Sequence, residues 1–307
     1  MPDVVCIGET MAQLVPLDGD LETGDTFQMR IAGSESNVAT ALARLDVSVA
    51  WASRLGADAL GRRIRNQLSA VGVDVGLVEI DPARPTGIFL KQPAGQRRDV
   101  VYYRDGSAAS QLDRNCWHAA VDANPAVIFC SGIDAALSAT SRDSMIEGLD
   151  YARSRGVLVA LDVNYRPVLW RQPEVAAQCL LDLARTADIV LAGWDEAAAL
   201  WQVADAAQVR ALLPTAELVL REPPVQVSSY HGDTVTTLAL PHVDVVEAVG
   251  AGDAFAAGYL YGHLHDWPPL QRLKAGHVLA ASSLRRHGDE STVTRAELQQ
   301  SIRREWA

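Results

Sequence analysis

The stretch VVEAVGAGDAFAAGYLYGHL, residues 245–264, places two glycines and an aspartate between a β-branched run and an alanine-rich segment. We predict that a helix begins at Gly250-Ala251-Gly252-Asp253, where the first N–H groups of a helix have no partner within it. Because Gly250 and Gly252 carry no side chain, these N–H groups can form a hole for an anion such as a phosphoryl group. Asp253 beside the hole can accept a proton from an attacking hydroxyl. The alternative is structural: glycines that make a turn and an acid that stabilises the first helical turn.

Short β-rich runs alternate with helical patterns in the part of the chain before this stretch. Strands are predicted at 127–131, 157–163, 188–192 and 217–220, and helices at about 141–155, near 173–186 and in an alanine-rich segment ending near 204. Such alternation predicts a parallel sheet covered by helices. The runs are almost continuously apolar, as burial of both sheet faces requires.

The first third of the chain has a different pattern. Helices are predicted at about 34–45 and 58–71, and two strands joined by a turn at 86–104. Strand pairs that interrupt an α/β pattern indicate a small β-sheet at one edge, which we interpret as a lid with strands from about 9–32 and 86–106. No repeat or Pro/Ser-rich linker divides the chain, so we predict a single α/β domain spanning 1–307.

Composition narrows the classes of partner. The chain has 307 residues and a formal net charge of −11, which argues against non-specific binding to nucleic-acid phosphates. No uncharged apolar segment approaches the roughly 18–20 residues of a membrane span, so we expect no membrane partner. The sequence begins without a basic, apolar leader, and its four cysteines form no C-x-x-C pair, so we expect a cytoplasmic protein with reduced thiols. A small molecule is the expected partner.

Several motifs resemble those of the ribokinase-like carbohydrate kinases, also called the phosphofructokinase B family. Gly250-Ala251-Gly252-Asp253 matches the end of the family signature D-T-x-G-A-G-D, and AGSESNVATALARL (32–45) is similar to its sugar-binding motif. RLGADALGRRIRNQLSAVGVD (54–74) is similar to its R-x-G-x-D-x-x-G segment. VVYYRDGSAAS (100–110) and LDVNYRPVLW (161–170) resemble the branch that phosphorylates 2-keto-3-deoxygluconate. The resemblance implies a three-layer α/β/α core with a mostly parallel central sheet and a β-sheet lid.

The resemblance also implies roles for individual residues. Asp253 would be the catalytic base, with Gly250, Ala251 and Gly252 forming the anion hole. The residues implied to line the substrate site are Gly33, Asn37, Phe89, Tyr102, Tyr103, Arg104, Arg166 and Asp253. Arg104 and Arg166 suit the carboxylate of a sugar acid, because guanidinium groups bind carboxylates with paired hydrogen bonds.

The implied cofactors are ATP and Mg²⁺. The residues implied to bind the nucleotide are Gly193, Glu196, Arg221, His277 and the anion hole at 250–252. No direct metal ligand is assigned; Glu196 and Glu247 would act on Mg²⁺ through water. The family also implies a homodimer formed through the lid.

Three segments depart from the family pattern. Ala248 and Val249 replace hydroxyl residues, and Gly193 replaces the amide of the motif N-x-x-E. Arg221 is followed by Glu222-Pro223-Pro224 where the family has a glycine-containing nucleotide loop, and the two prolines remove two N–H donors. Two alternatives therefore stay open: a kinase for another sugar such as fructose, and a sugar-acid-binding protein without kinase activity.

Overall fold

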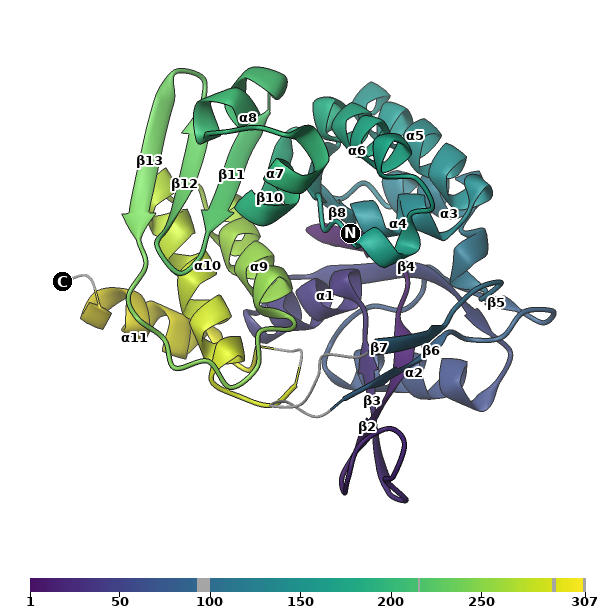
Figure 1. Ribbon diagram of the computed structural model, residues 1–307. Coiled ribbons are helices and arrows are strands. Elements are labelled where there is room, and N and C mark those ends of the chain that lie inside the picture. The colour runs from purple at the N-terminus through teal and green to yellow at the C-terminus, as the bar shows by residue number, and fades with distance from the viewer. Residues whose placement is uncertain (93–99, 215, 289–290, 306–307) are drawn as a thin grey trace.

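The computed structural model describes residues 1–92, 100–214, 216–288 and 291–305 (Figure 1). Its centre is a nine-stranded sheet with the order β13-β12-β11-β10-β9-β8-β1-β4-β5. The strands of this sheet are β1 Val4–Ile7, β4 Val49–Gly56, β5 Val78–Asp81, β8 Val127–Ser131, β9 Leu158–Asp162, β10 Ile189–Gly193, β11 Glu217–Glu222, β12 Gln226–His231 and β13 Thr234–Ala239.

The pairing of these strands confirms the predicted mostly parallel sheet. Neighbours from β11 through β5 all run parallel, whereas β12 and β13 form an antiparallel hairpin at the β11 edge. The sequence interpretation did not include this hairpin. Glu222-Pro223-Pro224 lies where β11 turns into β12.

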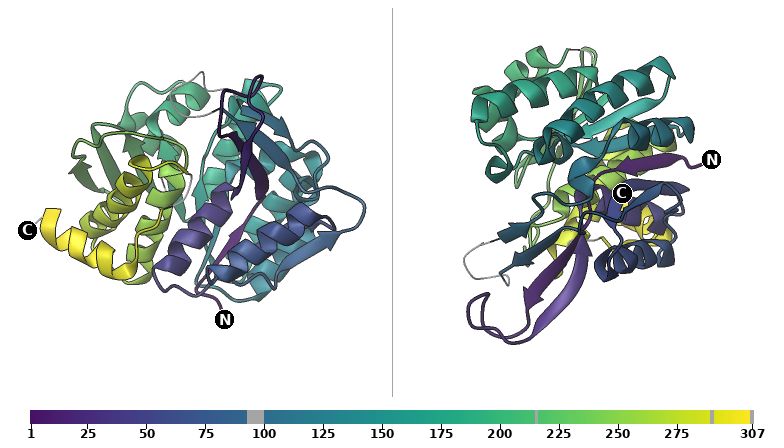
Figure 2. Two further views of the ribbon diagram at one scale, coloured as in Figure 1. Left: turned by 90° about the horizontal axis from the view of Figure 1, so that it is seen from below. Right: turned by 90° about the vertical axis from the view of Figure 1, so that its right-hand side faces the viewer.

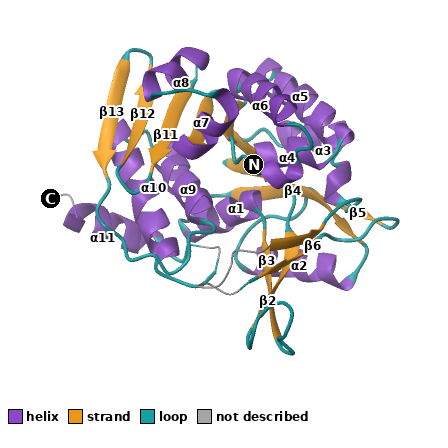
Figure 3. Ribbon diagram, viewed as in Figure 1, coloured by secondary structure: helices purple, strands orange, loops and turns teal. Residues whose placement is uncertain are grey.

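Helices cover both faces of the sheet (Figures 2 and 3). They are α1 Ser34–Arg44, α2 Ala59–Ala70, α3 Arg114–Asp122, α4 Gly132–Leu137, α5 Ala139–Ser154, α6 Pro173–Thr186, α7 Trp194–Trp201, α8 Ala206–Leu212, α9 Ala251–Leu264, α10 Pro269–Leu284 and α11 Arg295–Glu305. One apolar core joins the sheet to α1, α2, α9 and α10, and the other joins it to α3, α5, α6, α7 and α8. Side chains of one strand enter the two cores alternately, as Val4 and Val5 do.

Local signals explain where individual helices begin. The Asp58 carboxylate accepts a hydrogen bond of 2.7 Å from the Gly61 N–H and so caps α2, while Ile64 and Leu68 are buried one turn apart. The predicted helix at 58–71 is thus confirmed within one residue at each end. The helix predicted at 141–155 corresponds to α5 and begins two residues earlier, after the short α4.

The lid is a separate four-stranded sheet with the order β3-β2-β6-β7. Its strands are β2 Met11–Pro16, β3 Phe27–Ala32, β6 Ile88–Lys91 and β7 Val100–Tyr103. It projects from the body below α1 in Figure 1, which confirms the predicted small sheet. Residues 93–99 of the predicted strand pair lie outside the described residues.

The structure also bears on the cysteines and on possible membrane-spanning helices. All four cysteines are free, and Cys6, Cys116 and Cys130 are buried. Within the described ranges, every helix is too short or too polar to cross a bilayer.

Candidate active site

A cavity of ≈ 470 Å³ lies where the carboxyl ends of β1, β9, β10 and β11 meet the lid. Polar groups from these strand ends meet lid residues across it. Ligand sites of open α/β sheets are found at this edge, because the loops that follow parallel strands converge there. Charged side chains of both signs line the cavity. The acids are Glu9, Glu35, Asp162, Glu196 and Asp253, the last of which lies at the start of α9, and the cations are Lys91, Arg104, Arg166 and Arg221.

Asp253 is held in the cavity by the first turn of α1. Its Oδ1 accepts a hydrogen bond of 2.7 Å from the Ser34 hydroxyl, and its Oδ2 accepts one of 2.8 Å from the Asn37 amide. The Asn164 amide in turn donates to the Ser34 Oγ at 2.8 Å. Helices α1 and α9 lie side by side, so residues more than two hundred positions apart fix one carboxylate.

Burial raises the pKa of Asp253 to about 6, although the hydrogen bonds from Asn37 and Ser34 favour the ionised form. The charge of Asp162 contributes to this rise of the pKa, and the charge of Arg166 opposes it. A carboxylate with this pKa is ionised above neutral pH and still basic enough to take a proton from a hydroxyl during reaction.

The predicted anion hole lies at the turn before α9. Gly250, which caps α9, has φ = 81°, a left-handed conformation that favours glycine. Gly250 and Gly252 line the cavity, and Ala251 lies between them. The N–H groups of this first turn and the positive end of the helix dipole can stabilise negative charge here.

Arg221 lies beneath this turn and is paired with Asp162. Its Nη2 donates to Asp162 Oδ1 at 2.7 Å and its Nη1 to Asp162 Oδ2 at 3.2 Å, while Nη1 also donates to the Gly252 carbonyl oxygen at 3.2 Å. A β-carbon on Gly252 would lie only 3.0 Å from that Nη1. The arginine predicted to bind nucleotide thus donates a hydrogen bond to the turn of the predicted anion hole and borders the cavity.

Glu196 and Arg166 form the neighbouring ion pair. Glu196 Oε2 accepts a hydrogen bond of 2.8 Å from the Gly193 N–H at the start of α7, and its Oε1 lies 3.5 Å from Arg166 Nη1. Burial and the charge of Asp162 raise the Glu196 pKa, while Arg221 lowers it. The Arg166 side chain is 48% exposed, so its guanidinium can still receive an anion from the cavity.

Arg104 also lines the cavity but is buried against an acid. Its Nε donates to Glu9 Oε2 at 2.7 Å, its Nη2 pairs with the same oxygen, and the Ser107 hydroxyl donates to Glu9 Oε1 at 2.5 Å. The guanidinium carbon lies 5.6 Å from the centre of the Tyr102 ring. Glu9 therefore compensates the Arg104 charge, whereas Arg166 remains the more accessible of the two predicted carboxylate ligands.

Glu35, which also lines the cavity, is only partly ionised at neutral pH because its pKa is raised. Burial raises its pKa to about 7, while a hydrogen bond with Ser131 lowers it. Burial and the charge of Glu35 likewise raise the pKa of Asp134 behind it.

The structure brings most of the predicted substrate residues together. Gly33, Asn37, Phe89, Tyr102, Arg104, Arg166 and Asp253 all line the cavity. Phe89 and Tyr102 stack with ring centres 5.8 Å apart. Gly33 is required by close packing, because a β-carbon there would lie 2.2 Å from the Glu9 carbonyl oxygen.

Tyr103 and His277 are predicted site residues that lie outside the lining of this cavity. Tyr103 follows Tyr102 on β7, and because alternate strand residues face opposite ways, its side chain is 65% exposed and does not line the cavity. His277 is buried within α10 and is also absent from the lining. Gly193 and Ala251 are also absent from the lining; the Gly193 N–H donates to Glu196, and Ala251 is the first residue of α9.

Several cavity residues were not predicted from the sequence. Asp162 is the last residue of β9, Asn164 lies two residues after β9, Glu9 lies two residues after β1, and Ser34 starts α1. Each is a polar residue at or close to the end of an apolar strand, or at a helix start, and this position is the signal that the sequence offered. Lys91 of β6 was also not predicted; it pairs with Glu247 in the loop before Gly250.

The acids expected to act on Mg²⁺ through water have different surroundings. Glu196 lines the cavity and offers carboxylate oxygens, the ligand type that Mg²⁺ prefers. Glu247 is paired with Lys91 and accepts a hydrogen bond of 3.1 Å from the Gly288 N–H. Glu196 therefore fits the role better than Glu247.

The known proteins that this chain resembles in sequence and structure are carbohydrate kinases. Residues 1–295 match the profile described as pfkB family carbohydrate kinase. The chain is 32% identical to 2-dehydro-3-deoxygalactonokinase of Haloferax volcanii, covering 98% of this chain and 96% of that protein. It is 32% identical to 2-dehydro-3-deoxygluconokinase of Bacillus subtilis, covering 94% and 91%. An uncharacterized sugar kinase from Pyrococcus horikoshii, solved in complex with ATP, is 26% identical, covers 98% and 99% of the two chains and superimposes with a TM-score of 0.85.

Proposed function

The chain belongs to the pfkB family of carbohydrate kinases, and on that premise we propose that it phosphorylates the terminal hydroxyl of 2-keto-3-deoxygluconate with ATP. The observation that carries the proposal is the Asp253 carboxylate, held by Ser34 and Asn37 beside the glycine turn of α9. Both relatives named above act, by their names, on 2-keto-3-deoxy sugar acids that differ in one stereocentre.

In the proposed reaction, the substrate hydroxyl oxygen attacks the terminal phosphorus of ATP. The new O–P bond forms as the bond from phosphorus to ADP breaks, and the hydroxyl proton passes to Asp253. The first N–H groups of α9 stabilise the charge on the transferring group. Arg166 binds the substrate carboxylate, and Tyr102 and Asn164 orient hydroxyl groups. Mg²⁺, held through water by Glu196, would neutralise phosphate charge.

A substrate screen with an Arg166 variant tests the proposal. We expect ADP release with 2-keto-3-deoxygluconate and a lower kcat/KM with fructose, measured in a coupled assay. Arg166→Gln should raise KM for the sugar acid roughly ten- to hundredfold, because it removes a charge-assisted hydrogen bond. The KM for fructose, which has no carboxylate, should not change.

Three outcomes of this screen separate the alternatives. Equal or better turnover of fructose would favour the fructokinase alternative, and preference for 2-keto-3-deoxygalactonate would assign the other stereoisomer. No turnover of any sugar, together with no calorimetric binding of an ATP analogue and Mg²⁺, would favour the sugar-acid-binding alternative raised by Glu222-Pro223-Pro224.

The pKa of Asp253 predicts a pH dependence of the proposed reaction. The base must be ionised, so kcat/KM should be constant above about pH 7 and fall as pH drops through about 6. Well below that pH the loss should be about tenfold per pH unit, since each unit reduces the ionised fraction tenfold. Initial rates from pH 5 to 8 check this, and a flat profile down to pH 5 would contradict the assigned base.

The proposal includes a homodimer formed through the lid in the cytoplasm, where ATP is available. Apolar lid side chains support it, since Phe27, Val101 and Tyr103 are 37%, 42% and 65% exposed. Sedimentation velocity should show a dimer, and a single monomeric species at micromolar concentration would contradict the interface.

A further inference from the structure

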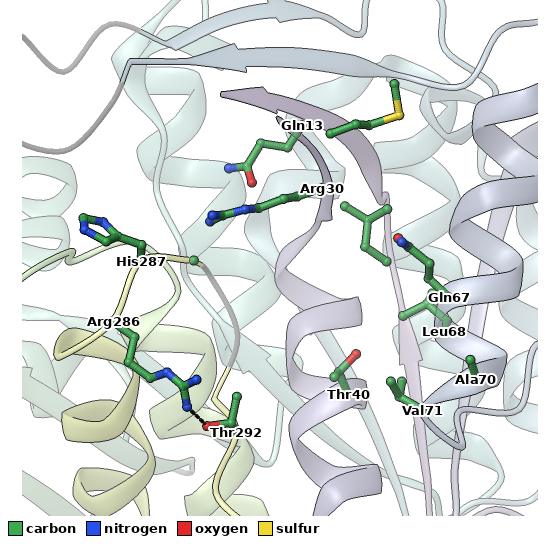
Figure 4. Close-up of a pocket in the computed structure, with 13 residues that line it drawn as sticks. Gln13, Arg30, Thr40, Gln67, Leu68, Ala70, Val71, Arg286, His287 and Thr292 are labelled. Atoms are coloured by element: carbon green, nitrogen blue, oxygen red, sulfur yellow. Dashed lines mark hydrogen bonds between the residues drawn. The ribbon is translucent and has the colours of Figure 1, made fainter. Parts of the chain in front are cut away.

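A second cavity of ≈ 480 Å³ lies at the base of the lid (Figure 4). Its walls come from β2 and β3 of the lid, from α1 and α2, and from residues that follow α10. The described residues that line it are all different from those that line the active-site cavity. The two cavities are therefore distinct, although both lie between the lid and the body.

The charge of this second cavity is opposite to that of the protein. Two arginines, Arg30 and Arg286, line it, and none of the described lining residues is acidic. The whole chain, by contrast, carries 38 acidic and 27 basic residues. Figure 4 shows Arg30 extending from β3 toward His287, with Arg286 on the same side of the cavity. Such a local excess of cations in an acidic protein favours an anionic ligand.

The rest of the lining is apolar or neutral. Met29, Ile31, Leu68 and Val71 give it an apolar wall. The Thr40 hydroxyl is buried without a hydrogen-bond partner among the described residues and points toward the cavity in Figure 4. A buried hydroxyl without a partner is costly, and a ligand atom would satisfy it.

We propose that this cavity binds a small organic phosphate, and that the bound ligand acts on the lid. Guanidinium groups are the side chains best suited to a phosphate dianion, and Arg30 and Arg286 supply two. The volume is within the range of about 300–1,000 Å³ usual for small-molecule sites, which leaves room for an organic body against the apolar wall.

The connection to the active site runs through three elements. Arg30 belongs to the lid, whereas Arg286 belongs to the body, so a ligand between them favours the present lid position. Thr40 lies one turn after Asn37, which holds Asp253. The Gly288 N–H donates to Glu247, the partner of Lys91 in the active-site cavity. Ligand binding in one cavity should therefore change affinity in the other.

The binding experiment uses 1-naphthyl phosphate, with inorganic phosphate and 1-naphthol as separate probes, in calorimetry on the full chain. We expect the phosphate ester to bind more tightly than either fragment. Arg30→Gln/Arg286→Gln should weaken binding of the ester on the order of tenfold or more. The matched control Arg62→Gln/Arg65→Gln, which removes two exposed arginines of α2 outside the cavity lining, should bind as the wild type does.

A second variant fills the cavity and leaves its two arginines in place. Ala70→Trp places a large side chain in the cavity from an exposed position and should also abolish binding. In rate measurements, saturating 1-naphthyl phosphate should shift the KM for the sugar substrate in the wild type and leave that of Ala70→Trp unchanged.

Two results would overturn the proposal. Binding that persists in both cavity variants, or that is lost only when an ATP analogue is added, would assign the phosphate to the active site. Binding in the second cavity with no shift in KM would remove the action on the lid. Neither result depends on which sugar the enzyme phosphorylates.

Discussion

Asp253→Asn is expected to lower kcat by about 10²- to 10⁴-fold, the range that general acid–base catalysis contributes. The asparagine has nearly the same shape, so Ser34 can still donate to its side-chain oxygen at the start of α9. An amide does not accept the hydroxyl proton at neutral pH, and the substrate would transfer that proton to solvent. The KM values should change far less than kcat, because Asp253 is assigned to the proton rather than to binding.

The matched control is Asp195→Asn. Asp195 is an exposed acid in the first turn of α7 and does not line the active-site cavity, so the same change of charge should leave kcat unaltered. Single-turnover rates and circular dichroism of both variants distinguish loss of chemistry from loss of fold. Wild-type turnover in Asp253→Asn would refute the assigned base.

Asp162→Leu is expected to destabilise the fold by about 3–5 kcal/mol, the usual cost of removing one member of a buried ion pair. Asp162 is 1% exposed, and it accepts two hydrogen bonds from Arg221. The variant leaves the mostly buried Arg221 guanidinium, whose side chain is 15% exposed, without its closest acid, while Glu196 lies 3.9 Å away. The midpoint of urea unfolding, followed by tryptophan fluorescence, measures the loss.

The double variant Asp162→Leu/Arg221→Met tests whether the cost comes from the unpaired charge. Removing both charges should restore much of the lost stability, since no buried ion then lacks its partner. Losses in the two single variants that simply add in the double variant would show that the pair is not coupled.

The parts of the fold that follow from local pattern were predictable from the sequence. Helix α2 has its cap at Asp58 and apolar residues one turn apart, and α6 begins at Pro173 and ends at Thr186, as the pattern indicated. The β12–β13 hairpin was not predicted, because its strands carry serine and threonine at an edge where burial is partial. Edge strands lack the continuous apolar run that identifies a central strand.

The candidate site was predictable only where a motif is contiguous. Gly250 to Asp253 is one such motif, but the partners of Asp253 lie 219 and 216 residues away, and one sequence contains no record of such pairing. The orientation of Tyr102 and Tyr103 was undecided for a related reason. Alternation places them on opposite faces of β7, and only the packed lid determines which face meets the cavity.

The contact between the starts of α1 and α9 has a consequence for synthesis of the protein. Ser34 leaves the ribosome 219 residues before Asp253. At about 5–20 residues per second, the interval is on the order of ten to forty seconds. A nascent chain therefore displays its N-terminal half well before the carboxylate exists, and it acquires the capacity to transfer phosphate only near the end of translation.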